Sequence, residues 1–156
     1  MYHIKIICIG KLKEQYWRDA EKEYVKRLGA YAKFSVHEIP EEPFRSSAER
    51  IQVLAKEGGK MIKIIPKDAY CIALEIKGKS FSSESFAELI QGHGECGGMI
   101  VFCIGGALGL SDEVLERANT RCSFSALTFP HQLVRIVVLE QVYRAMTIVH
   151  GKQYHY

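Results

Sequence analysis

Apolar residues alternate with polar ones, or run without interruption, in five short segments, and each segment ends close to a glycine or a proline. Such runs are typical of β-strands. The pattern predicts strands over residues 3–9, 33–39, 70–76, 99–104 and 123–129. The fourth segment, "MIVFCI", is apolar at every position, which is typical of a strand that is covered on both faces of a sheet.

Between these strands, apolar residues recur at the three- to four-residue spacing of a helix with a buried face. The spacing predicts helices over residues 12–28, 48–62, 82–91, 111–119 and 131–149. Because strands and helices alternate throughout, we expect an α/β fold in which helices flank both faces of a parallel sheet. No repeat, low-complexity tract or long linker interrupts the chain, so we expect one domain over residues 1–156.

The predicted last helix is apolar around most of its circumference. At about 100° per residue, its polar side chains gather on one narrow side: Glu140, Gln141, Arg144 and Thr147. One sheet covers only one side of a helix, so we expect a second copy of the chain to cover the rest, in a homodimer. Arg135 projects away from the polar side, and an arginine there must be paired or must face a cleft.

The composition is that of a soluble globular protein, with 47% hydrophobic and 25% charged residues. No apolar run reaches the length of a membrane span, and the N-terminal residues lack the features of a secretory signal. Cysteines are odd in number, and three of the five lie in predicted strands, where free thiols behave as small apolar groups. We therefore expect a cytoplasmic protein. A net charge of +3 permits a nucleic-acid partner without requiring one.

The stretch "IGGALGLS" (104–111) joins a buried strand to a helix that Ser111 caps. Glycines allow a close approach of backbone to a ligand, and free N–H groups lie at the start of the helix, so the stretch suits a nucleotide-like ligand. An ordinary tight turn explains the glycines equally well. The spacing is not that of a dinucleotide fingerprint, and no Gly-Lys-Ser/Thr of a P-loop follows, so a nicotinamide or NTP enzyme is not expected.

A second candidate stretch, "SFSALTFPHQLVR" (123–135), breaks at Pro130 just before the last helix. Ser125 and Thr128 leave room for a flat ring, although a plain strand end with proline at the helix start gives the same pattern. His93 and Cys96 have no partner pair at zinc spacing, so no metal site is expected.

Several motifs together resemble the ribosomal large-subunit pseudouridine N3-methyltransferase family, RlmH. They are "GKLKEQYW", "EYVKRLG", "LEIKGKSFSSE", "FCIGGALGL", "SALTFPHQLVRIVVLEQVYRA" and the final "YHY". The resemblance implies a SPOUT-type α/β fold with a C-terminal trefoil knot, an arrangement that periodicity does not predict. It also implies S-adenosylmethionine as cofactor, a homodimer, and methylation of N3 of a pseudouridine in 23S rRNA within the 70S ribosome.

The same resemblance implies roles for individual residues. The cofactor-binding residues would be Leu74, Gly105, Phe124, Ser125, Ala126, Leu127, Thr128 and Phe129. Tyr154 and His155 would engage the target base, with His155 as a candidate proton acceptor. The chemistry of the reaction, and not the resemblance, suggests a role for Arg135, which would stabilise the negative charge that develops on the ring oxygens or anchor the tail. The tail of one copy would complete the site of the other.

This chain ends in Tyr156, where relatives commonly place a basic residue, so a phosphate contact is lost or replaced by stacking. Two other functions remain open on the sequence alone. One is methylation of another RNA, such as tRNA, and the other is a non-catalytic role in ribosome binding or assembly.

Overall fold

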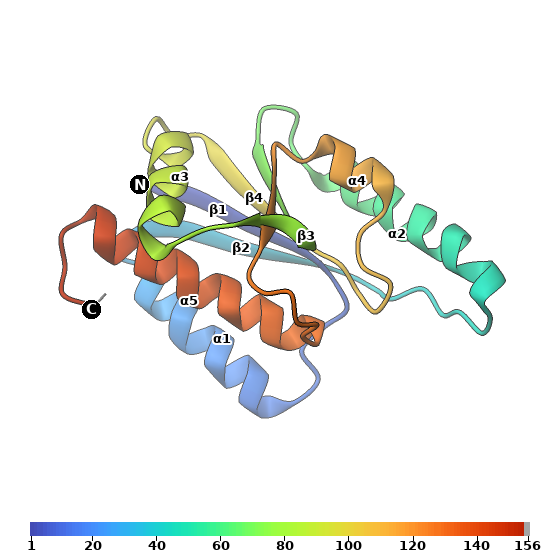
Figure 1. Ribbon diagram of the computed structural model, residues 1–156. Helices are drawn as coiled ribbons and strands as arrows, with labels where there is room; N and C mark the ends of the chain where they lie inside the picture. Colours follow the sequence, from blue (N-terminus) through green and yellow to red (C-terminus); the bar gives the residue numbers. More distant parts are fainter. Residues whose placement is uncertain (155–156) are drawn as a thin grey trace.

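The computed structural model describes residues 1–154, which form a sheet of five strands with helices packed against it (Figure 1). The strands are β1 (Tyr2–Ile9), β2 (Ala32–Ile39), β3 (Tyr70–Ser80), β4 (Met99–Ile104) and β5 (Thr120–Ser123). The helices are α1 (Gln15–Leu28), α2 (Arg50–Ile64), α3 (Ser83–Gly94), α4 (Asp112–Arg117) and α5 (His131–Val149), and a 3₁₀ turn, η1 (Ser47–Glu49), leads into α2.

All neighbouring strands are parallel, in the order β2-β1-β4-β3-β5. The apolar strand β4 lies at the centre between β1 and β3, and five of its six residues are buried. Parallel strands with helical connections need apolar cover on both faces. The expected α/β fold class is therefore confirmed, while the trefoil knot remains a prediction of the resemblance.

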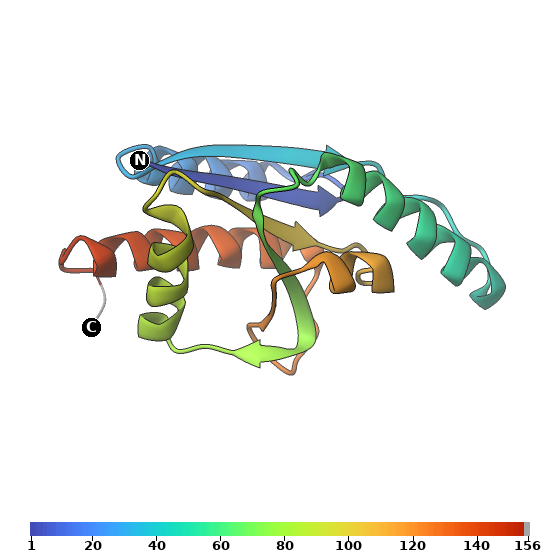
Figure 2. The same cartoon turned by 90° about the horizontal axis from the view of Figure 1, so that it is seen from above.

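Side chains alternate along β1, so this strand contributes to a separate core on each face of the sheet. Ile4 and Ile6 pack in the larger core, which includes residues of α1, α3 and α5. Ile7 and Ile9 pack in the smaller core with residues of α2 and α4. Figures 1 and 2 show α5 beside α1 and α3, and α2 beside α4 at the other end of the molecule. No helix within residues 1–154 has both the length and the hydropathy that crossing a bilayer requires.

Two strands, β3 and β5, differ from the prediction by more than one residue, and both differences shape the site. Gly78 does not end β3. A Cβ there would lie 2.7 Å from the backbone carbon of Arg121, so glycine lets β3 continue past β5 at close range. The predicted strand over 123–129 is wrong, because β5 occupies Thr120–Ser123 and residues 124–130 form a loop. Phe124, Leu127 and Phe129 of that loop line a cavity and have no strand partner.

Candidate cofactor pocket

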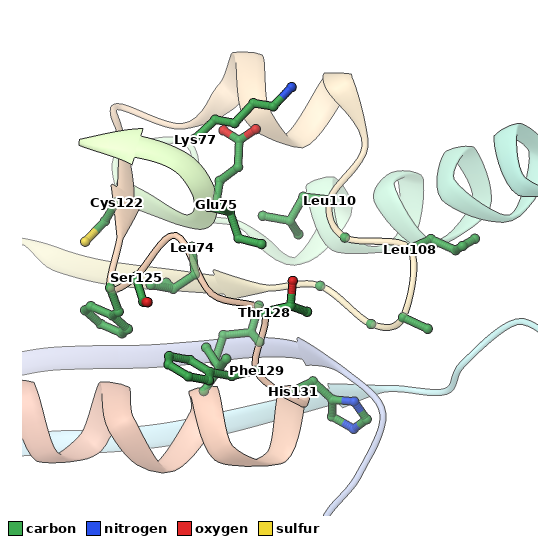
Figure 3. A pocket seen from close by; sticks show the side chains of 18 of the residues that line it. Leu74, Glu75, Lys77, Leu108, Leu110, Cys122, Ser125, Thr128, Phe129 and His131 are labelled. Carbon is green, nitrogen blue, oxygen red and sulfur yellow. The ribbon is translucent and has the colours of Figure 1, made fainter. Parts of the chain in front are cut away.

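A cavity of about 460 Å³ opens at the carboxyl ends of β3, β4 and β5 (Figure 3). Leu74, Ile104 and Cys122, from these three strands, form its floor. Ligands of open parallel sheets bind at this edge, and the volume is in the range of small-molecule sites. The two stretches that the sequence pointed to, 104–111 and 123–135, both contribute to the wall.

The glycine loop after β4 forms one wall and turns too tightly for larger residues. The N–H of Gly109 donates to the carbonyl of Gly106 at 3.1 Å, and Gly109 has a φ of +80°. A Cβ on Gly105 would lie 2.4 Å from the carbonyl carbon of Gly109. Glycine is therefore required at these positions, and the wall presents backbone to whatever fills the cavity.

The loop over residues 124–129 forms the opposite wall and is fixed by its own serines. The hydroxyl of Ser123 donates to the carbonyl of Ser125 at 3.1 Å, and the N–H of Leu127 donates to the Ser125 hydroxyl at 3.0 Å. The N–H groups of Ala126, Thr128 and Phe129 have no hydrogen-bond partner among residues 1–154. Of these three residues, Thr128 and Phe129 line the cavity. Free backbone donors beside apolar side chains suit a flat heteroaromatic ring such as the adenine of S-adenosylmethionine.

The structure brings most of the predicted cofactor residues together. Those that line the cavity are Leu74, Gly105, Phe124, Ser125, Leu127, Thr128 and Phe129. Ala126 belongs to the same loop but does not line the cavity. Sequence reasoning missed Glu75, Lys77 and His131, which also line it. In the sequence, Glu75 directly follows Leu74, Lys77 lies three residues after Leu74, and His131 directly follows Pro130.

Two titratable side chains of the pocket, Cys122 and His131, lie in different surroundings. Burial raises the pKa of the Cys122 thiol to about 12, so Cys122 contributes a neutral, apolar patch of floor. The imidazole of His131 lies at the rim, where its Nδ1 is 3.9 Å from Oε1 of Glu41. Its Nε2 is buried and has no hydrogen-bond partner among the described residues. A Cβ on Gly10 would lie 2.7 Å from this nitrogen, so the ring packs directly on the glycine.

Arg135 lies outside the pocket, in a cluster of charges between α5, α1 and β2. Its guanidinium donates to both oxygens of Glu21 and, at 2.7 Å, to Oε2 of Glu38. Burial acts to lower the pKa of Arg135, but the hydrogen bonds to the two carboxylates raise it overall, so the side chain stays charged. Of the two environments expected for this arginine, the structure has the paired one. This placement gives no support to the expected contact with a substrate ring.

Tyr154 lies on the polar side of α5, away from the pocket of its own chain. Its hydroxyl donates to Oε2 of Glu140 at 2.8 Å, its ring packs edge-on against Tyr143, and the guanidinium of Arg144 lies 4.8 Å from the ring centroid. Burial and the bond to Glu140 raise the pKa of Tyr154, so the phenol keeps its proton. His155 lies outside the described residues. Within residues 1–154, no group of three acidic, histidine or cysteine side chains is arranged to hold a metal ion.

Comparison with known proteins places the chain among methyltransferases. Residues 2–155 match a family model described as "Predicted SPOUT methyltransferase". The chain is 50% identical over 157 residues to "Ribosomal RNA large subunit methyltransferase H" of Listeria monocytogenes serotype 4a (strain HCC23), which covers 98% of this chain and 99% of the relative. Proteins of the same name from Pelotomaculum thermopropionicum and Limosilactobacillus reuteri (strain DSM 20016) are 46% and 48% identical, over 100% and 98% of this chain and 100% and 99% of their own.

Proposed function

The chain belongs to the SPOUT methyltransferase family, and we propose from this premise that it methylates large-subunit ribosomal RNA with S-adenosylmethionine as the donor. The names of relatives that align over nearly the whole chain support the RNA class. The motifs that resemble the RlmH family support the finer assignment, which is N3 of a pseudouridine in 23S rRNA on the assembled 70S ribosome. The observation that carries the proposal is the cavity whose wall offers free backbone donors beside apolar side chains.

Each group of predicted cofactor residues would contact a different part of the S-adenosylmethionine molecule. Residues 124–129 would enclose the adenine and ribose, with the unpartnered N–H groups of this loop as hydrogen-bond donors. Gly105 and its loop would approach from the opposite side, where no side chain interferes. Leu74 would cover the ring from the strand edge. Backbone recognition of this kind explains why the chain lacks the acidic residue that a dinucleotide site uses to bind ribose.

When bound, S-adenosylmethionine supplies an electrophilic methyl group on a sulfonium, and an in-line displacement needs no covalent enzyme intermediate. The residues of the chain must then hold the acceptor ring in line with that methyl group and remove the proton from N3. We assign proton removal to His155, whose side-chain type titrates near neutral pH. Because the pKa of Tyr154 is raised, this phenol serves as a stacking group or hydrogen-bond donor and not as the base.

We assign the tail to the pocket of a second copy. α5 begins at the pocket with His131, and its 19 residues span roughly 28 Å at 1.5 Å per residue. The chain turns back after the far end of this helix (Figure 1). The hydroxyl of Tyr154 is bonded to Glu140 of the same helix. Leu133 and Val137 of α5 are only half-buried in one copy and lie outside both cores, which supports a homodimer that covers this helix.

Ribosomes from cells that lack this gene provide the test. The purified protein is given S-adenosylmethionine labelled in the methyl group and, separately, 70S ribosomes, free 23S rRNA or tRNA. We expect label on the ribosomes alone, and mass spectrometry of the rRNA should locate it on one pseudouridine. Label on tRNA would identify a different RNA substrate. Donor binding without transfer to any RNA would indicate the non-catalytic alternative.

A pair of variants tests the role of His155. His155→Ala should lower the turnover number by about 100-fold, the usual contribution of a general base, while donor affinity stays within twofold. His37→Ala, an exposed histidine of β2, serves as the matched control and should leave both quantities unchanged. Unchanged turnover in His155→Ala would remove His155 from the mechanism.

A further inference from the structure

The second half of β3 contains a bulge that faces the cofactor pocket. Cys122 of β5 pairs with Leu74 before the bulge and with Lys79 after it, so residues 75–78 have no partner in β5. Gly78 closes the bulge, where its Cα packs on the backbone of Arg121. Bulges beside functional sites redirect side chains. Here the bulge places consecutive residues, Leu74 to Lys77, along the edge of the cavity (Figure 3).

Two of these residues, Glu75 and Lys77, carry opposite charges. Within the described chain they are the only Asp, Glu, Lys or Arg side chains that line the cavity. Glu75 is half-buried and Lys77 is exposed at the mouth. Neither side chain has a hydrogen bond or an ion pair to any other residue within 1–154. A half-buried carboxylate that has no partner within the described chain is available to pair with a cationic group of a ligand.

We propose that Glu75 and Lys77 recognise the amino-acid end of the donor, Glu75 binding its α-ammonium group and Lys77 its α-carboxylate. The proposal rests on the proposed function, because it assumes that the cavity binds S-adenosylmethionine. The donor carries one ammonium and one carboxylate on the same carbon, and the cavity offers one group of each opposite sign. His131, the other titratable side chain at the rim, is next to Glu41 and on the far side of the 124–129 loop (Figure 3).

The difference in burial between Glu75 and Lys77 explains why the ammonium group would bind deeper in the cavity than the carboxylate. The ammonium would meet the half-buried Glu75, where a lower local dielectric strengthens the charge pair. The carboxylate would meet Lys77 at the mouth, where water still solvates both groups. The adenine would then lie toward the loop over 124–129 and the amino acid toward the bulge of β3. In this orientation the adenine would bind to backbone N–H groups of the 124–129 loop, and the amino-acid end would bind to the charged side chains of β3.

The test compares ligands that differ only in the amino-acid end. Calorimetry measures binding of S-adenosylmethionine, S-adenosylhomocysteine and 5′-methylthioadenosine, which lacks the amino-acid end, to the parent and to Glu75→Gln and Lys77→Met. Each variant should bind the first two ligands about tenfold more weakly, the size expected for loss of one charge-assisted hydrogen bond. Binding of 5′-methylthioadenosine should stay within twofold of the parent, which also verifies that the pocket of each variant is folded. Glu88→Gln and Lys79→Met are the matched controls, because both side chains lie outside the cavity.

Several outcomes would overturn the inference alone. Equal weakening of all three ligands would mean that the charges maintain the pocket without reading the amino acid. Weakening of S-adenosylmethionine but not of S-adenosylhomocysteine would assign Glu75 to the sulfonium. Unchanged donor affinity with a raised KM for ribosomes would assign Lys77 to an RNA phosphate. If the parent bound none of the three ligands, the proposed function would fail as well.

Discussion

Arg135 links three elements through one buried guanidinium. It is 4% exposed, whereas the side chains of Glu21 and Glu38 are 20% and 42% exposed, so water can solvate the carboxylates but hardly reaches the cation. A buried charge persists only when it is paired, and here the pairing joins α5 to α1 and β2. This geometry supports a structural role for Arg135 at the start of α5, and the expected role at the substrate stays a prediction.

Arg135→Met tests this role. It should lower the free energy of unfolding by about 2 kcal/mol, because the charge-assisted hydrogen bonds that join α5 to α1 and β2 are lost, while water can still solvate the two carboxylates. Urea denaturation measures the change, and the triple variant with Glu21→Gln and Glu38→Gln should recover part of it. Lys60→Met, which removes a more exposed ion pair with Glu42, should lose less than about 1 kcal/mol. Unchanged stability together with lost methyl transfer would instead place Arg135 at the substrate.

Cysteine reactivity should follow burial and the resulting pKa values. Burial raises the pKa of Cys8 to about 11 and that of Cys122 to about 12, while Cys96 is exposed. A raised pKa favours the neutral thiol, so Cys8 and Cys122 should stay unreactive until the pH approaches those values. The hydrogen bond with Cys103 lowers the pKa of Cys71, but both of these thiols are fully buried and out of reach of the reagent. Between pH 7 and pH 9, iodoacetamide should therefore label Cys96 alone in the native protein and all five cysteines after denaturation, as counted by mass spectrometry. Labelling of Cys122 at pH 9 would contradict the closed floor of the pocket.

Among the helices and strands, those whose apolar residues mostly pack in the protein interior were predicted best. The range predicted for β4 matches residue for residue, because five of its six residues are buried, and the range of α5 matches as well. The pattern over 123–129 misled, since hydrophobicity there serves a ligand cavity and not a strand. Periodicity also placed the end of β3 too early, because Gly78 usually marks a turn and here allows close approach to β5. A hydrophobic pattern indicates that a side chain is buried, but it does not indicate whether a strand, a helix or a ligand covers it.

The paired glycines of α2 provide a test at this level, because their surroundings differ completely. A Cβ on Gly58 would lie 2.0 Å from Oγ of Ser111, the residue that caps α4, whereas a Cβ on Gly59 would have nothing within 4 Å. Gly58→Ala should therefore destabilise the protein by about 1 to 3 kcal/mol through overpacking. Gly59→Ala should stabilise it by about 0.5 to 1 kcal/mol through helix propensity. Urea denaturation of the two variants should give changes of opposite sign, and a loss in both would mean that the faces of α2 are misassigned.

For the molecule as a whole, the sequence predicted most residues of the cofactor pocket. It did not predict which residues complete the site around the pocket. Seven of the eight predicted cofactor residues line one cavity, because parallel topology brings strand ends together at one edge. Glu75 and Lys77 escaped notice because only the β3 bulge turns them toward that cavity. The role of the tail was predicted from the family resemblance alone, because no periodicity of the sequence relates the last residues to a pocket at the start of α5. Tyr154 is bonded to Glu140 in its own chain, and the contribution of a second copy to the site stays a proposal.

Mixed dimers test whether the tail acts across the interface. One copy carries Leu74→Trp, which fills the cavity, and the other carries Tyr154→Ala with His155→Ala; two affinity tags isolate dimers that contain one of each. If tails act in the partner, the mixed dimer has one intact site of two and should methylate ribosomes at about half the parent rate, because a symmetric dimer has two equivalent sites. Each variant alone should be inactive, since every site in those dimers lacks either the cavity or the tail. If tails act in their own chain, the mixed dimer should be as inactive as the two variants. Activity in the mixed dimer therefore requires that the cavity and the tail of a working site come from different copies.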